Sequence, residues 1–176
     1  MKIKELLEKE HSKKQTIKII RYVGNDRLRF DELVSFALCS DKKLAQRASW
    51  PLLYSAQNNP AFVKKHLRKM IRQLNTPVHN AIKRNFMHIF EFADIPEFLQ
   101  GEIISLGFEL LNNKDEAIAV KVFSMSMLAR FCMKYPDLKK ELNASIQHQL
   151  PYQSAGFRSR ARKVLNQING LSGRRR

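Results

Sequence analysis

The sequence predicts an all-α protein built as a stack of paired helices, and three observations support this fold class. A helix start led by proline recurs along the chain, at Pro60, Pro96 and Pro136. Side chains that can cap a helix precede apolar runs of helical period at five places. No stretch shows the sustained alternation and hairpin turns of a sheet. With 176 residues and 44% hydrophobic content, the chain is long enough for one such array.

The three prolines set the length of the repeat. Proline suits the first position of a helix because its missing N–H would have had no partner there. The prolines lie 36 and 40 residues apart, and an apolar residue follows each of them two positions later: Phe62, Phe98 and Leu138. This period is typical of solenoid repeats, in which a helical pair buries its apolar face only by stacking on its neighbours.

Taken in order along the chain, these signals predict five helical pairs. The expected ranges are 2–10 with 13–23, 27–39 with 41–56, 60–74 with 76–92, 96–111 with 115–134, and 137–149 with 155–168. The second helix of each pair follows a residue whose side-chain oxygen can accept a hydrogen bond from a free helical N–H group. These expected caps are Ser12, Asp41, Thr76, Asp115 and Ser154.

Two of the helices carry further information in their side chains. In the helix at 60–74, the residues Val63, Leu67, Met70, Ile71 and Leu74 form one apolar stripe. The opposite side is basic and carries Lys64, Lys65, Arg68 and Arg72. The helix at 115–134 is apolar almost all round, so we expect it to be the most buried element, with Val122 and Phe123 in its core.

Six positions after each expected cap, a basic residue occurs in four of the five units. The residues at these positions are Lys18, Arg47, Ile82, Lys121 and Arg160. With this pattern the chain resembles the HEAT-repeat family, whose second helix commonly begins with Asp and carries Arg or Lys six residues later. The resemblance implies an α-α superhelix, or solenoid, of about five HEAT-like pairs. It also implies a polar ladder between adjacent units, here formed by Asp41, Arg47, Asp115, Lys121 and Arg160.

We expect one HEAT-like domain over residues 1–169, followed by a flexible basic tail over 170–176 that ends in three arginines. The start of the chain lacks the apolar core of a secretory signal, and no apolar run reaches the length that spans a bilayer. The sequence therefore predicts a cytoplasmic protein with no membrane partner. Cys39 and Cys132 are interpreted as reduced packing residues.

Positive charge dominates the chain and is unevenly distributed. Lys and Arg total 32 against 16 Asp and Glu, which gives a net charge of +16. Between Lys42 and Phe90 there are ten basic residues and no acidic one. From Glu91 to Glu116 acidic residues prevail, and no acid follows Glu141. Such a charge balance favours an acidic partner, either nucleic acid or an acidic protein.

In HEAT-like proteins the second helices line the concave surface. The resemblance therefore implies that a set of basic side chains lies on or near one face and binds the acidic partner: Lys42, Lys43, Lys83, Arg84, Arg158 and Arg162. The alternative interpretation is structural. In that case Arg47, Lys121 and Arg160 link adjacent units, and the remaining lysines keep a helical surface hydrated.

The sequence shows no pattern typical of catalysis. Its five histidines are scattered, so we expect no metal site, and its glycines form no phosphate-binding loop, so we expect no nucleotide or other small-molecule cofactor. These observations favour a non-enzymatic adaptor that binds nucleic acid or another acidic partner. No residue indicates the oligomeric state.

Two alternatives remain open at this stage. The chain is distantly similar to HEAT-like alkylpurine DNA glycosylases. Such an enzyme would need a carboxylate beside aromatic side chains to stabilise the positive charge that develops on the sugar. The single tryptophan, Trp50, and the nearby Asp41 are interpreted more simply as a core residue and a helix cap, so no catalytic residue is assigned. The other alternative is a scaffold that binds an acidic protein segment in its groove.

Overall fold

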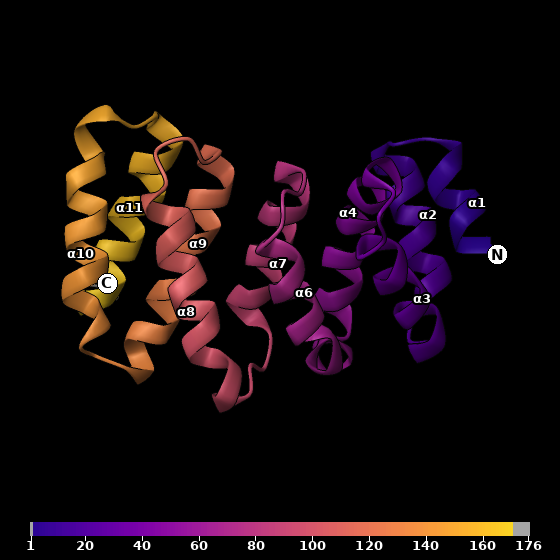
Figure 1. The fold of residues 1–176 in the computed structure, drawn as a ribbon, viewed down its shortest axis with the longest axis horizontal. Helices are drawn as coiled ribbons and strands as arrows, with labels where there is room; N and C mark the ends of the chain where they lie inside the picture. The colour runs from indigo at the N-terminus through magenta and orange to yellow at the C-terminus, as the bar shows by residue number, and fades with distance from the viewer. Residues whose placement is uncertain (1, 171–176) are drawn as a thin grey trace, which may run out of the picture. The chain divides into compact units, whose positions relative to one another are not determined.

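Helices make up most of the computed structural model, which describes residues 2–170 and contains no strand within them (Figure 1). The first helices are α1 (Lys2–Lys9), α2 (Lys13–Val23), α3 (Arg27–Ala37), α4 (Lys42–Asn58), α5 (Pro60–Val63) and α6 (Leu67–Leu74), with the 3₁₀ turn η1 (Lys64–His66) between α5 and α6. They are followed by α7 (Asn80–Phe92), α8 (Glu97–Asn112), α9 (Ile118–Lys134), α10 (Leu138–Gln149), η2 (Leu150–Tyr152) and α11 (Ala155–Ile168).

This order confirms the predicted all-α class and the five helical pairs, with α5, η1 and α6 together forming the first helix of the third pair. The chain divides into two compact units, the first ending at Leu99 and the second beginning at Gln100. The single domain over 1–169 stays a prediction. Of the expected tail over 170–176, residues 171–176 lie outside the described residues.

Three of the five expected caps begin their helices as predicted. Ser12 accepts a hydrogen bond from the N–H of Gln15 at 3.0 Å, and Asp41 accepts one from the N–H of Leu44 at 2.9 Å. Ser154 starts α11 in the same way. Each oxygen satisfies an N–H group that has no partner within its helix. Gly24 ends α2 with a φ of 50°, a backbone conformation that residues with a Cβ atom rarely adopt.

The expected caps at Thr76 and Asp115 are wrong. Pro77 follows Thr76 and disfavours the helical conformation there. The cap of α7 therefore lies three residues later, at His79, whose Nδ1 accepts a hydrogen bond from the N–H of Ala81 at 3.1 Å. Asp115 instead lies in a turn, and its N–H donates to Oδ1 of Asn113 at 3.0 Å. As a result, α9 begins only at Ile118.

The core of the first unit is built around α4, which packs against α2, α3 and α7. Within it, Leu52, Phe86 and Phe90 are fully buried. The predicted stripe of α5 and α6 is also confirmed, because Leu67, Met70 and the other apolar members are buried while the basic side is exposed. Each helix therefore contributes one apolar face to the shared interior.

In the second unit, α9 packs against α10 and α11. Met125 and Leu128 are fully buried, as expected for a helix that is apolar on nearly all sides. The specific choice of Val122 and Phe123 as core residues is wrong, since both are half-buried. Gly107 of α8 allows a close approach to this helix: a Cβ atom there would collide with the side chain of Met127.

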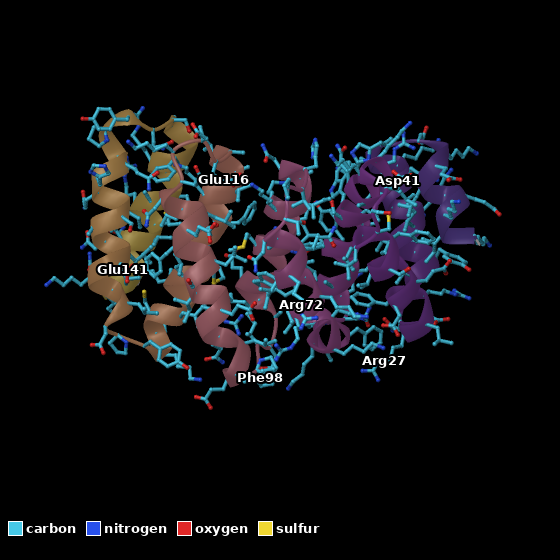
Figure 2. The ribbon with its side chains drawn as sticks, in the orientation of Figure 1. Arg27, Asp41, Arg72, Phe98, Glu116 and Glu141 are labelled. Carbon is cyan, nitrogen blue, oxygen red and sulfur yellow. The ribbon has the colours of Figure 1, made fainter. Side chains whose placement is uncertain are left out.

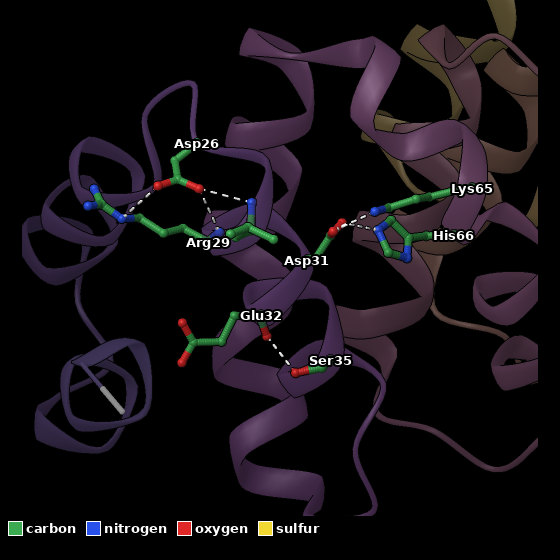
Figure 3. A network of polar contacts seen from close by, with 8 residues as sticks. Asp26, Arg29, Asp31, Glu32, Ser35, Lys65 and His66 are labelled. Carbon is green, nitrogen blue, oxygen red and sulfur yellow. Dashed lines mark hydrogen bonds and ion pairs between the residues drawn. The ribbon is translucent and has the colours of Figure 1, made fainter.

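A polar cluster joins the second and third pairs (Figure 3). One carboxylate oxygen of Asp31 on α3 accepts a hydrogen bond from Nζ of Lys65 at 2.5 Å, and the other lies 2.7 Å from Nε2 of His66. Burial acts to raise the pKa of Asp31, but the hydrogen bonds from Lys65 and His66 outweigh it and leave the pKa lowered. For His66 burial acts in the opposite direction and lowers the pKa, and it outweighs the hydrogen bond to Asp31.

Within residues 2–170, none of the helices combines the length and the apolar character needed to cross a bilayer.

The central position of α9 can be tested by placing a charge inside it. Leu128→Asp should unfold the second unit, because a buried carboxylate without a partner costs several kcal/mol. Ala119→Asp is the matched control, since Ala119 is exposed in the first turn of the same helix. Thermal denaturation followed by circular dichroism compares the two variants. An unchanged melting temperature for Leu128→Asp would contradict the packing described.

The Asp31 cluster gives stability a defined dependence on pH. Asp31→Asn should lower the free energy of unfolding at neutral pH by about 1–2 kcal/mol. Because folding lowers the pKa of Asp31, its contribution is complete above the unfolded value of about 3.9 and disappears as the pH falls through the folded value. Urea denaturation at a series of pH values should show the difference shrinking below about pH 4. A difference between wild type and Asp31→Asn that stays constant with pH would argue against the cluster. Asp137→Asn is the control, because Asp137 is exposed.

Candidate functional site

A pocket of about 510 Å³ opens in the first unit, between the end of α3, the start of α4, helix α6 and the loop before α7. Its floor is apolar and its rim carries three long cationic side chains: Lys42, Lys69 and Arg72. We refer to it as the basic pocket. None of the residues that line it is Asp or Glu.

Local structure explains how each cation reaches the rim. The Asp41 cap begins α4 at Lys42, which leaves this lysine exposed in the first helical turn. On α6, the neighbours Met70 and Ile71 are buried in the core, so Lys69 and Arg72 are exposed on the other side of the helix. The amphipathic period of α6 thus places two cations one turn apart on the pocket side.

Hydrogen bonds fix the walls of the basic pocket. Nε2 of Gln73 donates to the carbonyl oxygen of Ala37 at 3.3 Å, which ties α6 to the end of α3. The hydroxyl of Thr76 donates to the carbonyl oxygen of Gln73 at 2.7 Å and closes the end of α6. His79, whose ring caps α7, lines the far side. The pocket is therefore a built feature of the fold.

The charge at the rim is not neutralised within the part of the chain that the structure describes. Lys42, Lys69 and Arg72 form no ion pair with residues 2–170. By contrast, Lys64 pairs with Asp94 at 2.9 Å and Lys65 pairs with Asp31. The pocket cations are consequently available to a negatively charged ligand.

Of the six side chains expected to bind an acidic partner, only Lys42 lines the basic pocket. Lys43 follows Lys42 on α4 and is exposed, and Lys83 and Arg84 are half-buried on α7. Nε of Arg84 donates to Oδ1 of Asn85 at 3.3 Å. The other two, Arg158 and Arg162, are exposed on α11 in the second unit. That all six act on one face stays a prediction.

Sequence reasoning missed Lys69 and His79 and placed Arg72 on a face separate from that of Lys42. The structure brings Arg72 and Lys42 to one pocket. One signal in the sequence pointed to this region: all the cations of the pocket belong to the stretch from Lys42 to Phe90 that contains no acid.

Comparison with known proteins gives one match. Residues 3–168 match the HEAT repeat domain family. The chain belongs to the HEAT repeat family. No curated protein and no solved structure matches it.

Within this HEAT repeat protein, three of the expected ladder residues reach a neighbouring helix. Arg47 donates from Nη1 to the carbonyl oxygens of Leu7 and Glu8, at 3.0 and 2.9 Å. Nζ of Lys121 donates to Oε1 of Gln149 at 2.9 Å, and Nη1 of Arg160 donates to Oγ of Ser126 at 2.7 Å. Asp41 serves as a cap and Asp115 lies in a turn, so the two acidic members act within their own loops.

The glycosylase resemblance gains no support from these comparisons. Trp50 is half-buried, and its ring packs edge-on against the imidazole of His11 with centroids 5.5 Å apart. Among residues 2–170, no group of three or more His, Cys, Asp or Glu side chains is arranged to hold a metal ion.

Arg47 offers a test of the contacts between repeats. Arg47→Met keeps much of the side-chain volume but removes the donors to the last carbonyls of α1, so the free energy of unfolding should fall by about 1–2 kcal/mol. Hydrogen exchange of the α1 amides should quicken. Lys43→Met, on the exposed side of the same helix, is the control and should change neither. Equal behaviour of the two variants would show that Arg47 does not hold α1.

Proposed function

We propose that this HEAT repeat protein is a binding module for nucleic acid and that the basic pocket of its first unit is the centre of the contact surface. HEAT membership identifies the chain as a helical-repeat binding or scaffold module. The observation that supports the finer proposal is the basic pocket itself, where Lys42 from α4 meets Lys69 and Arg72 from α6 without an acidic residue in the lining.

The arrangement of the cations suits a chain of phosphates. A nucleic acid carries one negative charge per nucleotide, and each cation that pairs with a phosphate releases condensed counterions. Lys42, Lys69 and Arg72 come from two helices, and Lys43 adds a further exposed charge at the start of α4. Independently of these, α11 exposes Arg158, Arg162 and Lys163, which provide a second set of cations.

An aromatic ring in the first unit favours nucleic acid over an acidic protein segment. Phe98 is 72% exposed (Figure 2), although a phenyl ring usually packs inside a protein. The guanidinium of Arg68 lies 5.4 Å from the centre of this ring. Exposed aromatic rings beside cations are the means by which proteins stack unpaired bases and hold their phosphates.

Salt dependence tests the proposal. Fluorescence anisotropy with labelled single-stranded RNA, single-stranded DNA and duplex DNA should show binding that weakens about 10³-fold between ~50 and ~200 mM salt if roughly six phosphate contacts form. Absence of binding to all three at low salt would overturn the proposal. Binding of a poly-glutamate peptide in that case would favour the protein scaffold instead.

Charge reversal locates the surface. The triple variant Lys42→Glu, Lys69→Glu and Arg72→Glu should bind at least about tenfold more weakly in the same assay and show a shallower salt slope. A second triple variant, Lys13→Glu, Lys14→Glu and Lys18→Glu, changes the net charge equally at exposed positions of α2. It should lose less affinity. Equal losses would mean that net charge alone, and not the basic pocket, drives binding.

A further inference from the structure

The basic pocket has more apolar surface than phosphate binding requires. Its floor is formed by Leu38, Ala45, Val78 and Ile82, among other residues. A phosphodiester gains nothing from such a floor, because its oxygens stay hydrated or bind cations. The volume of about 510 Å³ falls in the range of sites that enclose a small organic group. The pocket therefore fits a ligand that combines negative charge with an apolar body.

The lining also offers free hydrogen-bonding groups. Nδ1 of His79 accepts the N–H of Ala81, so in the neutral ring the proton is on Nε2, which can donate to a ligand. The side-chain nitrogen of Gln73 donates to the carbonyl oxygen of Ala37, and the side-chain oxygen of Gln73 can accept a hydrogen bond from a ligand. The exposed hydroxyl of Ser40 can act in either way. Donors and acceptors are thus both present, as the edge of a nucleobase requires.

A nucleotide has all three properties: an anionic phosphate, a flat apolar ring and a polar edge. We infer that the basic pocket receives one unstacked nucleotide of a single strand, with its base on the apolar floor and its flanking phosphates on Lys42, Lys69 and Arg72. This inference rests on the proposed function and makes it specific. A duplex offers no unstacked base, and extracting one costs pairing and stacking energy. The protein should accordingly prefer single strands to duplex.

The decisive experiment fills the pocket without changing its charge. Val78→Trp puts a large neutral side chain into the floor from the loop before α7, where Val78 is half-buried. Ser40→Trp does so from the exposed loop between α3 and α4, so it provides a second variant if the first fails to fold. Circular dichroism confirms the fold of each. Anisotropy then measures binding to single-stranded RNA, to single-stranded DNA and to a duplex of the same sequence.

The wild-type protein should bind one of the single strands about tenfold or more tightly than the duplex, and the RNA and DNA arms show which sugar is preferred. A folded tryptophan variant should lose this preference and keep its salt-dependent duplex binding. A preference that survives in the folded variants, or equal wild-type binding of strand and duplex, would overturn the inference and leave the proposed function standing. If the wild-type protein bound none of the three nucleic acids, both the inference and the proposed function would be overturned.

Discussion

The structure depends on one constraint: no helical pair of this chain can bury its apolar face alone. Helix α4 carries apolar side chains toward α2, α3 and α7 at once, and α9 is apolar on nearly every side because it packs against both α10 and α11. Isolated helices of this length are marginal in water, so each one is stable only because its neighbours cover it. Positions on the helix surface remain free to carry charge, and in the first unit they carry mainly positive charge.

Polar contacts between successive pairs complement the apolar packing. Arg47 donates to carbonyl oxygens at the end of α1, Asp31 accepts hydrogen bonds from Lys65 and His66, and Arg160 donates to the hydroxyl oxygen of Ser126. In each case a side chain from one pair bonds to a group of another. These bonds use some of the basic residues for structure, whereas Lys42, Lys69 and Arg72 form no ion pair within residues 2–170 and line a pocket without Asp or Glu.

Much of the fold was predictable because its signals are local. Ser12, Asp41 and Ser154 each accept a hydrogen bond from an N–H group three residues away, so the sequence alone locates their helices. The prediction was wrong where another local effect prevailed: Pro77 moved the start of α7 beyond Thr76, and the turn at Asn113 moved the start of α9 beyond Asp115. A helix that is apolar all round has no polar stripe to fix its rotation, which is why Val122 and Phe123 were mistaken for core residues.

The basic pocket was predictable only in part. The acid-free stretch after Asp41 marked the region, but no spacing in the sequence encodes the tertiary arrangement that brings Lys42 to the same pocket as Lys69 and Arg72. The most direct test of a nucleic-acid surface at this pocket is hydrogen exchange with and without a bound single-stranded oligonucleotide. The account predicts slower exchange at residues 38–45 and 69–82, which contain the pocket walls. Saturation with the oligonucleotide while exchange in both segments stays unchanged would contradict it.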